Sequence, residues 1–359
     1  MSDKCIIFVS LLGIDQRVMD NSKRKIVFIV NPKSGVQGKG QIVRWIGERI
    51  DKKLYDTEII YTKWAGHAVN IAKEKAAEKV YAVVAIGGDG TINEIARSLV
   101  HTDTALGIIP CGSGNGLARH LKVSLDAKKA IDTINEGRLE TIDYGLINEI
   151  PFFCTCGVGF DAFISLKFAE AGKRGPLTYI EKTIRESINY APETYEVEID
   201  GQRAVHKAFV IACGNASQYG NNAYIAPRAS LNDGLLDVTI IEPFNMREAP
   251  SLSFQLFNKT IDQDSHVKTL KCNSLHIKRA KNGVAHFDGD PIMLGESINV
   301  KIVKQGLKVI IPSPKNSSGV LTRAQDYLEE IDDFIEQVSR HNKVILNKGK
   351  KQVKKILSQ

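Results

Sequence analysis

The sequence predicts an α/β protein in which an N-terminal doubly wound parallel-sheet domain precedes a C-terminal antiparallel β-sandwich. The chain has 359 residues, more than the roughly 100–200 residues of one ordinary domain. Strand-like and helix-like segments alternate from residue 25 to about residue 140, and short strands dominate after that. The first pattern is typical of parallel sheets covered by helices, and the second of half-exposed antiparallel sheets.

The composition is that of a soluble globular protein. Hydrophobic residues make up 43% of the chain and charged residues 25%, as in ordinary folded domains. The apolar run at 5–14 is too short for a membrane span, which needs about twenty residues, and no small-residue cleavage site follows it. The only close cysteine pair, Cys154 and Cys156, lacks the C-x-x-C spacing of zinc or redox sites. We therefore expect a cytoplasmic protein with reduced thiols.

Four strands with helices between them are expected in the first domain. The strands are KIVFIV (25–30), TEIIYT (57–62), VYAVVAI (80–86) and ALGIIP (105–110). The helices are expected at 41–54, 67–79 and 91–100. In the first helix, apolar residues recur at four-residue spacing, as on the buried face of an amphipathic helix.

Short strands separated by turn residues are expected in the second domain. They lie at 151–160, 195–201, 206–215, 235–242, 274–279 and 298–305, and a helical insertion is expected at 176–190. Several of them alternate apolar and polar residues, which favours a sandwich of antiparallel sheets.

The C-terminal part is expected to hold one more helix and a basic tail. The segment 321–341 carries an apolar stripe, and we favour its docking on the first domain over insertion into a membrane. After His341 there are six lysines and no acid. Such a tail can contact anionic lipid, although a merely solvated tail is an equally good interpretation.

The stretch GGDGT (87–91) directly follows the most apolar strand of the chain. Ligands of open α/β sheets bind beyond the carboxyl ends of the strands, where helix N-termini present unpaired N–H groups. Glycine lets phosphate oxygens approach the backbone because it has no Cβ. A tight turn alone would explain one or two glycines, but not Asp89 among three of them.

Two further strand ends repeat this pattern. NPKSG (31–35) follows the first strand and PCGSGNG (110–116) follows the fourth. Together, these loops offer many N–H donors, several hydroxyl groups and the Lys33 ammonium, a combination that suits a polyphosphate. Neither a Walker P-loop nor the dinucleotide-binding glycine motif is present.

In their order and spacing, these motifs resemble the diacylglycerol kinase catalytic-domain family of soluble lipid kinases. That family includes bacterial lipid kinases and sphingosine kinases and is related to NAD kinase and phosphofructokinase. The resemblance covers roughly residues 24–312 and rests on NPKSG, GGDGTINE (87–94), PCGSGNGLAR (110–119), GNASQYGNNAYIAPRASLNDGLLDV (214–238) and FDGDP (287–291). GGDGT by itself would leave NAD kinase open.

The resemblance implies a nucleotide site between two domains. It implies an extension at 1–24, an α/β domain at 25–140 that the chain rejoins at about 306–342, a β-sandwich at 141–305 and a tail at 343–359. The residues that it implies for ATP binding are Asn31, Pro32, Lys33, Ser34, Gly35, Thr62, Gly87, Gly88, Asp89, Gly90, Thr91, Ile92, Asn93, Gly112, Ser113 and Asn115.

Phosphoryl transfer from ATP needs a magnesium-bridged triphosphate, an in-line hydroxyl and a group that takes its proton. Within the family, both the GGDG aspartate, here Asp89, and the acid that ends a DGE motif have been assigned the last role. This chain has Asp290 where glutamate is usual, which withdraws the carboxylate by roughly 1.5 Å. Asp290 is our first candidate for the base and Asp89 the second. Asp89 lies within the phosphate-binding loop, so it can instead hold magnesium, directly or through water. A loose transition state also allows that neither acts as a base.

A structural magnesium site is implied at NDGLLD (232–237). In bacterial relatives, the aspartate of the DG pair holds the ion with two backbone carbonyls. The matching residues here are Asp233, Ser230 and Leu235. The alternative reading is a plain turn that enters a strand, which needs no metal.

The resemblance thus predicts a lipid kinase that uses ATP and Mg²⁺. Its expected partner is a membrane lipid at the inner face of a bilayer and not a nucleic acid, and a homodimer stays open. Diacylglycerol, phosphatidylglycerol and sphingoid bases are candidate acceptors. The two alternatives are an NAD kinase-like enzyme with a soluble acceptor, and a catalytically impaired, nucleotide-gated protein that binds membranes.

Overall fold

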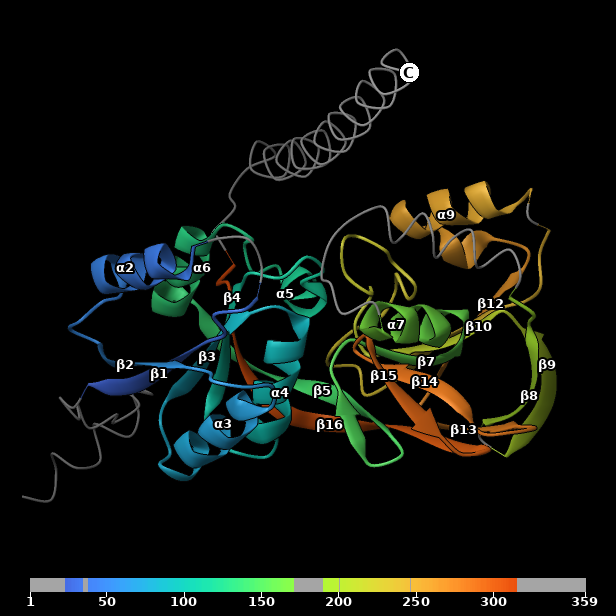
Figure 1. Ribbon diagram of the computed structural model, residues 1–359, viewed down its shortest axis with the longest axis horizontal. Coiled ribbons are helices and arrows are strands. Elements are labelled where there is room, and N and C mark those ends of the chain that lie inside the picture. Colours follow the sequence, from blue (N-terminus) through green and yellow to red (C-terminus); the bar gives the residue numbers. More distant parts are fainter. Residues whose placement is uncertain (1–22, 35–37, 171–189, 200, 246, 315–359) are drawn as a thin grey trace, which may run out of the picture. The chain divides into compact units, whose positions relative to one another are not determined.

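The computed structural model describes residues 23–34, 38–170, 190–199, 201–245 and 247–314 (Figure 1). Most of the N-terminal extension, nearly all of the insertion expected at 176–190, the helix expected at 321–341 and the basic tail lie outside the described residues. The described residues up to Pro312 form one compact unit. No helix in the described part of the chain is long and apolar enough to cross a membrane.

The first domain is built on a parallel sheet with the strand order β2-β1-β3-β4. The strands are β1 (Arg24–Val30), β2 (Tyr55–Tyr61), β3 (Ala82–Gly87) and β4 (Ala105–Pro110). Its helices are α2 (Lys39–Arg49), α3 (His67–Ala77), α4 (Asp89–Leu99), α5 (Gly116–His120) and α6 (Ala127–Glu136). Figure 1 shows α2 and α6 on one side of the sheet and α3 and α4 on the other. The predicted doubly wound arrangement is confirmed.

The last described strand, β16 (Ser297–Ile311), extends this sheet into the second domain. Its end lies parallel to β4, with Val309 opposite Leu106, and most of its length pairs with β5 (Arg138–Ile147). A bulge between Val303 and Leu307 interrupts that ladder. The sheet continues through β13 (Ser274–Arg279), β8 (Glu193–Ile199) and β9 (Gln202–Ala208), and β6 (Ile150–Phe152) pairs with β5.

A six-stranded antiparallel sheet forms the other layer of the second domain, in the order β12-β11-β10-β7-β14-β15. Its strands are β7 (Thr155–Gly159), β10 (Val210–Gly214), β11 (Leu236–Ile241), β12 (Val267–Cys272), β14 (Gly283–Phe287) and β15 (Asp290–Leu294). Apolar side chains of the two sheets, such as Val158 and Ile298, share one core. The predicted sandwich is confirmed.

The middle of the six-stranded sheet is buried on both faces, which explains the unbroken apolar run of β10. Ile211 and Cys213 face the core between the sheets. Val210 and Ala212 face a separate apolar cluster that includes Leu252. This cluster lies beneath two helices that the sequence did not predict, α7 (Phe160–Glu170) and α9 (Ala249–Phe257) (Figure 1).

The segment 151–160, predicted as one strand, is divided in the structure. β6 ends at Phe152 and β7 begins at Thr155. The N–H groups of Phe153, Cys154 and Thr155 turn instead toward the carboxylate of Asp288. This break therefore serves a polar contact that the strand pattern does not reveal.

Candidate active site

The three predicted loops meet at the carboxyl edge of the parallel sheet. The Asn31 side chain after β1 donates to the Thr91 hydroxyl in α4, at 2.9 Å. The Ser34 hydroxyl is buried and donates to the carbonyl of Asn31, at 3.0 Å. Thr62, which follows β2, donates its N–H to Val30 at the end of β1, at 2.9 Å. Gly35 lies outside the described residues.

Asp89 binds the loop that follows β4. One of its carboxylate oxygens accepts from the N–H of Asn115, at 2.8 Å, and the other from the N–H of Gly116, at 2.7 Å. Asn115 in turn closes the loop on itself through two hydrogen bonds with Gly112. Burial raises the pKa of Asp89, although these backbone donors act in the opposite direction. In this arrangement Asp89 connects two loops, and each of its oxygens accepts from a backbone N–H group.

The glycines of these loops have two different functions. A Cβ built on Gly112 would lie 2.6 Å from the Cα of Gly88, and a Cβ on Gly114 would lie 2.8 Å from an Asp89 oxygen. These glycines therefore allow the two loops to touch. A Cβ on Gly90 would meet nothing within 4 Å. Gly90 thus faces open space at the start of α4, as expected where a phosphate approaches.

The structure places a different aspartate, Asp288, at the centre of the contacts between the two domains. Its carboxylate accepts four hydrogen bonds: from the Asn93 side chain at 2.8 Å, and from the N–H groups of Phe153, Cys154 and Thr155 at 2.9, 2.7 and 3.1 Å. Burial raises its pKa, while these donors oppose the shift.

Asp288 has a conformation that explains its position. With Gly289 it forms the two-residue turn between β14 and β15, and both residues have positive φ angles, of 46° and 86°. Asp-Gly is a preferred pair for such hairpin turns. Asp290 begins β15 opposite Phe287 and is exposed. Its role as the base stays a prediction, but the geometry favours Asp288.

The candidate site is a cavity of about 620 Å³ between these groups and the helices of the second domain. One end is polar and is lined by Asp89, Asn93, Ser113 and Asp288. The remainder is mostly apolar and lies under α7 and α9, where its wall includes Phe160, Ile164, Phe168, Phe209, Ile225, Leu252 and Leu256. Such a volume is typical of small-molecule sites.

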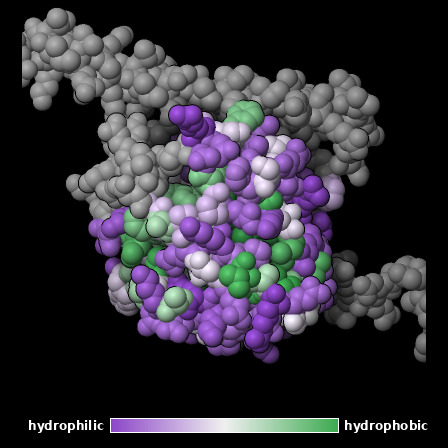
Figure 2. Space-filling model, turned by 90° about the vertical axis from the view of Figure 1, so that its right-hand side faces the viewer, coloured by the Kyte–Doolittle hydropathy of each residue, from purple (hydrophilic) through white to green (hydrophobic). Residues whose placement is uncertain are grey.

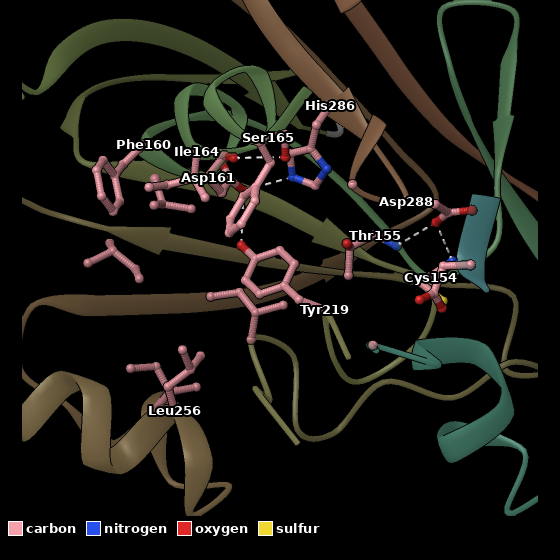
Figure 3. Close-up of a pocket in the computed structure, with 18 of the residues that line it drawn as sticks. Cys154, Thr155, Phe160, Asp161, Ile164, Ser165, Tyr219, Leu256, His286 and Asp288 are labelled. Atoms are coloured by element: carbon pink, nitrogen blue, oxygen red, sulfur yellow. Dashed lines mark hydrogen bonds and ion pairs between the residues drawn. The ribbon is translucent and has the colours of Figure 1, made fainter. Parts of the chain in front are cut away.

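A buried polar cluster lines the cavity between its two ends (Figure 3). Asp161, at the start of α7, accepts from the Tyr219 hydroxyl at 2.9 Å and lies 3.0 Å from Nε2 of His286. Burial raises the pKa of Tyr219, which keeps its phenol protonated as a donor. A Cβ on Gly157 would lie 2.6 Å from Asp161. Asp161 belongs to no motif of the sequence, and its only local signal is an acid in the first turn after a glycine-ended strand. Tyr219 lies in the stretch 214–238, whose tyrosines the sequence offers for the acceptor head group.

The residues expected to hold a structural magnesium are engaged with each other and with a lysine. The Lys271 ammonium lies 2.8 Å from Asp233 and 3.1 Å from Asp237, and it donates to the carbonyl of Arg228 at 3.4 Å. Asp233 also accepts from the N–H of Leu235. As these side chains lie, the Lys271 ammonium occupies the position beside Asp233 that a cation would take. A magnesium ion at this turn stays a prediction.

Known proteins resemble both domains. A model of the diacylglycerol kinase catalytic domain matches residues 25–147, and one of the YegS C-terminal NAD kinase β-sandwich-like domain matches residues 155–311. The chain is 28% identical over 294 residues to "Diacylglycerol kinase" of Bacillus subtilis (strain 168). The aligned region covers 80% of this chain and 96% of that relative. It is 33% identical over 201 residues to "Probable lipid kinase YegS-like" of Chromohalobacter salexigens, covering 54% of this chain and 64% of that one.

Solved structures share the fold. The crystal structure of a diacylglycerol kinase from Bacillus anthracis str. Sterne matches with a TM-score of 0.64 and 21% identity, over 80% of this chain and 97% of that one. The fold and the paired matches define a two-domain kinase. Residues 25–147 match the diacylglycerol kinase catalytic-domain family, and the two domains together resemble the lipid kinases of that family.

Proposed function

We propose that this protein is an ATP- and magnesium-dependent kinase that transfers the γ-phosphate to a hydroxyl group of a membrane lipid. One observation carries the proposal: one cavity has phosphate-type loops and a partly buried aspartate, Asp288, at one end and an apolar interior at the other. The first end suits a triphosphate and the second suits acyl chains. The enzyme would work in the cytoplasm, at the membrane surface where its acceptor lies.

The nucleotide would be held by the loops at the sheet edge. The start of α4, which no side chain caps, the exposed Ser113 hydroxyl and the exposed Lys33 ammonium would supply donors and positive charge for phosphate oxygens. Magnesium, when bound with ATP, neutralises charge that develops during phosphoryl transfer. Positioning is the main contribution that such a site makes to the reaction.

Asp288 would receive the acceptor hydroxyl. Its four donors occupy the lone pairs of a carboxylate, so a substrate hydroxyl must replace one of them. The Asn93 side chain is the donor that can turn away, since the other three belong to the backbone. The hydroxyl oxygen then bonds to the γ-phosphorus, the bond from phosphorus to the β–γ bridging oxygen breaks, ADP leaves, and Asp288 takes the proton.

Labelled ATP with magnesium tests the proposal directly. The purified protein is incubated with vesicles that contain diacylglycerol, phosphatidylglycerol or a sphingoid base, and separately with NAD. We expect label to enter a lipid and not NAD, because most of the cavity wall beyond the polar cluster is apolar. Label in NAD would support the NAD kinase alternative. Label in no acceptor would favour the impaired, nucleotide-gated alternative.

Filling the apolar part of the cavity should select against long acyl chains. Ile164 is partly buried and lines the cavity from α7. We expect Ile164→Trp to raise KM for a long-chain acceptor by about tenfold or more, because buried chains lose contact area, while KM for ATP stays near the parent value. Val205→Trp, on β9 outside the cavity, is the control. Equal losses for short and long acceptors would contradict an acyl-chain site.

A further inference from the structure

Helix α9 exposes a large apolar surface next to the cavity. Phe254 and Phe257 are 68% and 54% exposed, although large apolar side chains are usually buried. The helix sequence, APSLSFQLF, contains no charged residue. Figure 2 shows the side of the molecule that lies to the right in Figure 1, where hydrophilic residues dominate and apolar residues form small groups.

The opposite face of the same helix forms part of the cavity wall. Leu252, Ser253 and Leu256 of α9 line the cavity, as does Phe168 of α7. Ser253 is exposed, and Phe168 is 43% exposed. Because these residues belong both to the cavity wall and to the surface, the cavity reaches the exterior between α7 and α9. The exposed phenylalanines of α9 therefore lie beside that opening.

Basic side chains lie at both ends of α9. Arg247 precedes the helix and Lys259 follows it, and both are exposed. The nearby acids already have partners: Glu248 accepts from the N–H of Asn245, and Asp262 pairs with Arg228. Exposed phenylalanines flanked by basic residues can contact both the apolar boundary of a bilayer and its anionic headgroups.

We propose that α9, together with Phe168, is the surface by which this protein rests on a lipid bilayer, so that the acceptor passes from the membrane directly into the cavity between α7 and α9. Phe254 and Phe257 enter the interfacial region, and Arg247 and Lys259 contact anionic headgroups. The inference rests on the proposed function for the identity of the cavity's ligand. The docking itself requires no catalysis.

Vesicle co-sedimentation of the full chain without nucleotide tests the docking. For Phe254→Gln/Phe257→Gln, we expect binding to phosphatidylcholine vesicles containing phosphatidylglycerol to weaken by about tenfold or more. Arg247→Gln/Lys259→Gln should weaken binding mainly at low salt, because surface charge is screened by salt. Val205→Gln removes another side chain that is 70% exposed, on β9, and should bind like the parent. The basic tail is present in every variant.

A parent protein that binds no vesicles, or a phenylalanine double variant that binds like the parent, overturns the proposal. A parent dimer that this variant converts to a monomer also overturns it, because the face would then hold a second copy. In the Phe254→Gln/Phe257→Gln variant, the rate at which a short-chain acceptor dispersed in solution is phosphorylated should stay within about twofold of the parent rate. If the parent phosphorylates no lipid but the binding difference persists, the proposed function fails and the docking surface stands.

Discussion

Asp288→Asn should lower kcat by about a hundredfold or more, which is the contribution expected from a group that takes a proton in the transition state. An asparagine retains the size of the side chain and can still accept from part of the backbone donors around position 288. It cannot take a proton. KM for ATP should change little, because Asp288 reaches the nucleotide loops only through the Asn93 side chain, which can also donate to an asparagine. Steady-state kinetics with saturating lipid measure both constants.

Asp290→Asn is the matched control for this prediction. The substitution is the same and lies two residues away, but Asp290 is exposed and lies outside the cavity lining. We expect a change of less than about threefold in kcat, as for a side chain that makes no transition-state contact. If Asp290→Asn carries the large loss and Asp288→Asn keeps parental turnover, the base is Asp290, as the motif comparison predicted.

The pH profile supplies a second measurement of the same group. An ordinary aspartate has a pKa of about 3.9, and burial raises the pKa of Asp288 above its usual value. A base works only when deprotonated, so activity should fall on acidification, and this fall should begin at a higher pH than for an ordinary aspartate. The residual activity of Asp288→Asn should lack this acidic limb, whereas Asp290→Asn should retain it.

The sequence predicted the first domain well because its signals are local. Each strand end carries its glycines and polar residues within a few positions of an apolar run, and parallel strands bring these ends to one edge. The contacts between Asn31 and Thr91 and between Asp89 and Asn115 follow from that placement. By contrast, the family motif points to Asp290 because that acid ends the motif. The structure favours Asp288, whose place among its backbone donors depends on the turn conformation of Asp288 and Gly289.

The apolar end of the site could not be predicted for a different reason. Helix α9 is a short, uncharged segment whose apolar residues face both the cavity and solvent, so it has no clear apolar stripe of helical period. The cluster of Asp161, Tyr219 and His286 joins residues separated by 58 to 125 positions. Such long-range partners leave no periodic signal in the sequence.

Asp89→Asn should raise KM for ATP by about tenfold or more and lower kcat/KM by about a hundredfold. The two Asp89 oxygens accept from the N–H groups of Asn115 and Gly116. An asparagine has one carbonyl oxygen, so one of these N–H groups would face an amide donor. The loop that carries Ser113 should therefore move away from the start of α4, and phosphate oxygens should lose donors from both.

Stability should change much less than activity in this variant. Burial raises the pKa of Asp89, which means that its ionised form is disfavoured in the folded state. Folding stability should therefore fall as the pH rises from the unfolded pKa to the higher folded pKa, and stay level above it. The uncharged asparagine avoids the cost of burying an ionised carboxylate. This gain offsets part of the about 1–3 kcal/mol that is lost when one backbone N–H group is left without its acceptor.

Kinetics and unfolding measured side by side separate the two roles considered for Asp89. A loop-positioning role predicts a raised KM for ATP together with a small change in the free energy of unfolding, and the pH slope of stability should flatten in the variant. A direct role as the base predicts instead an unchanged KM and a loss confined to kcat. Asp103→Asn, at a site exposed and ion-paired with Lys308 in the same domain, should leave both kinetic constants at parental values, because it touches neither loop.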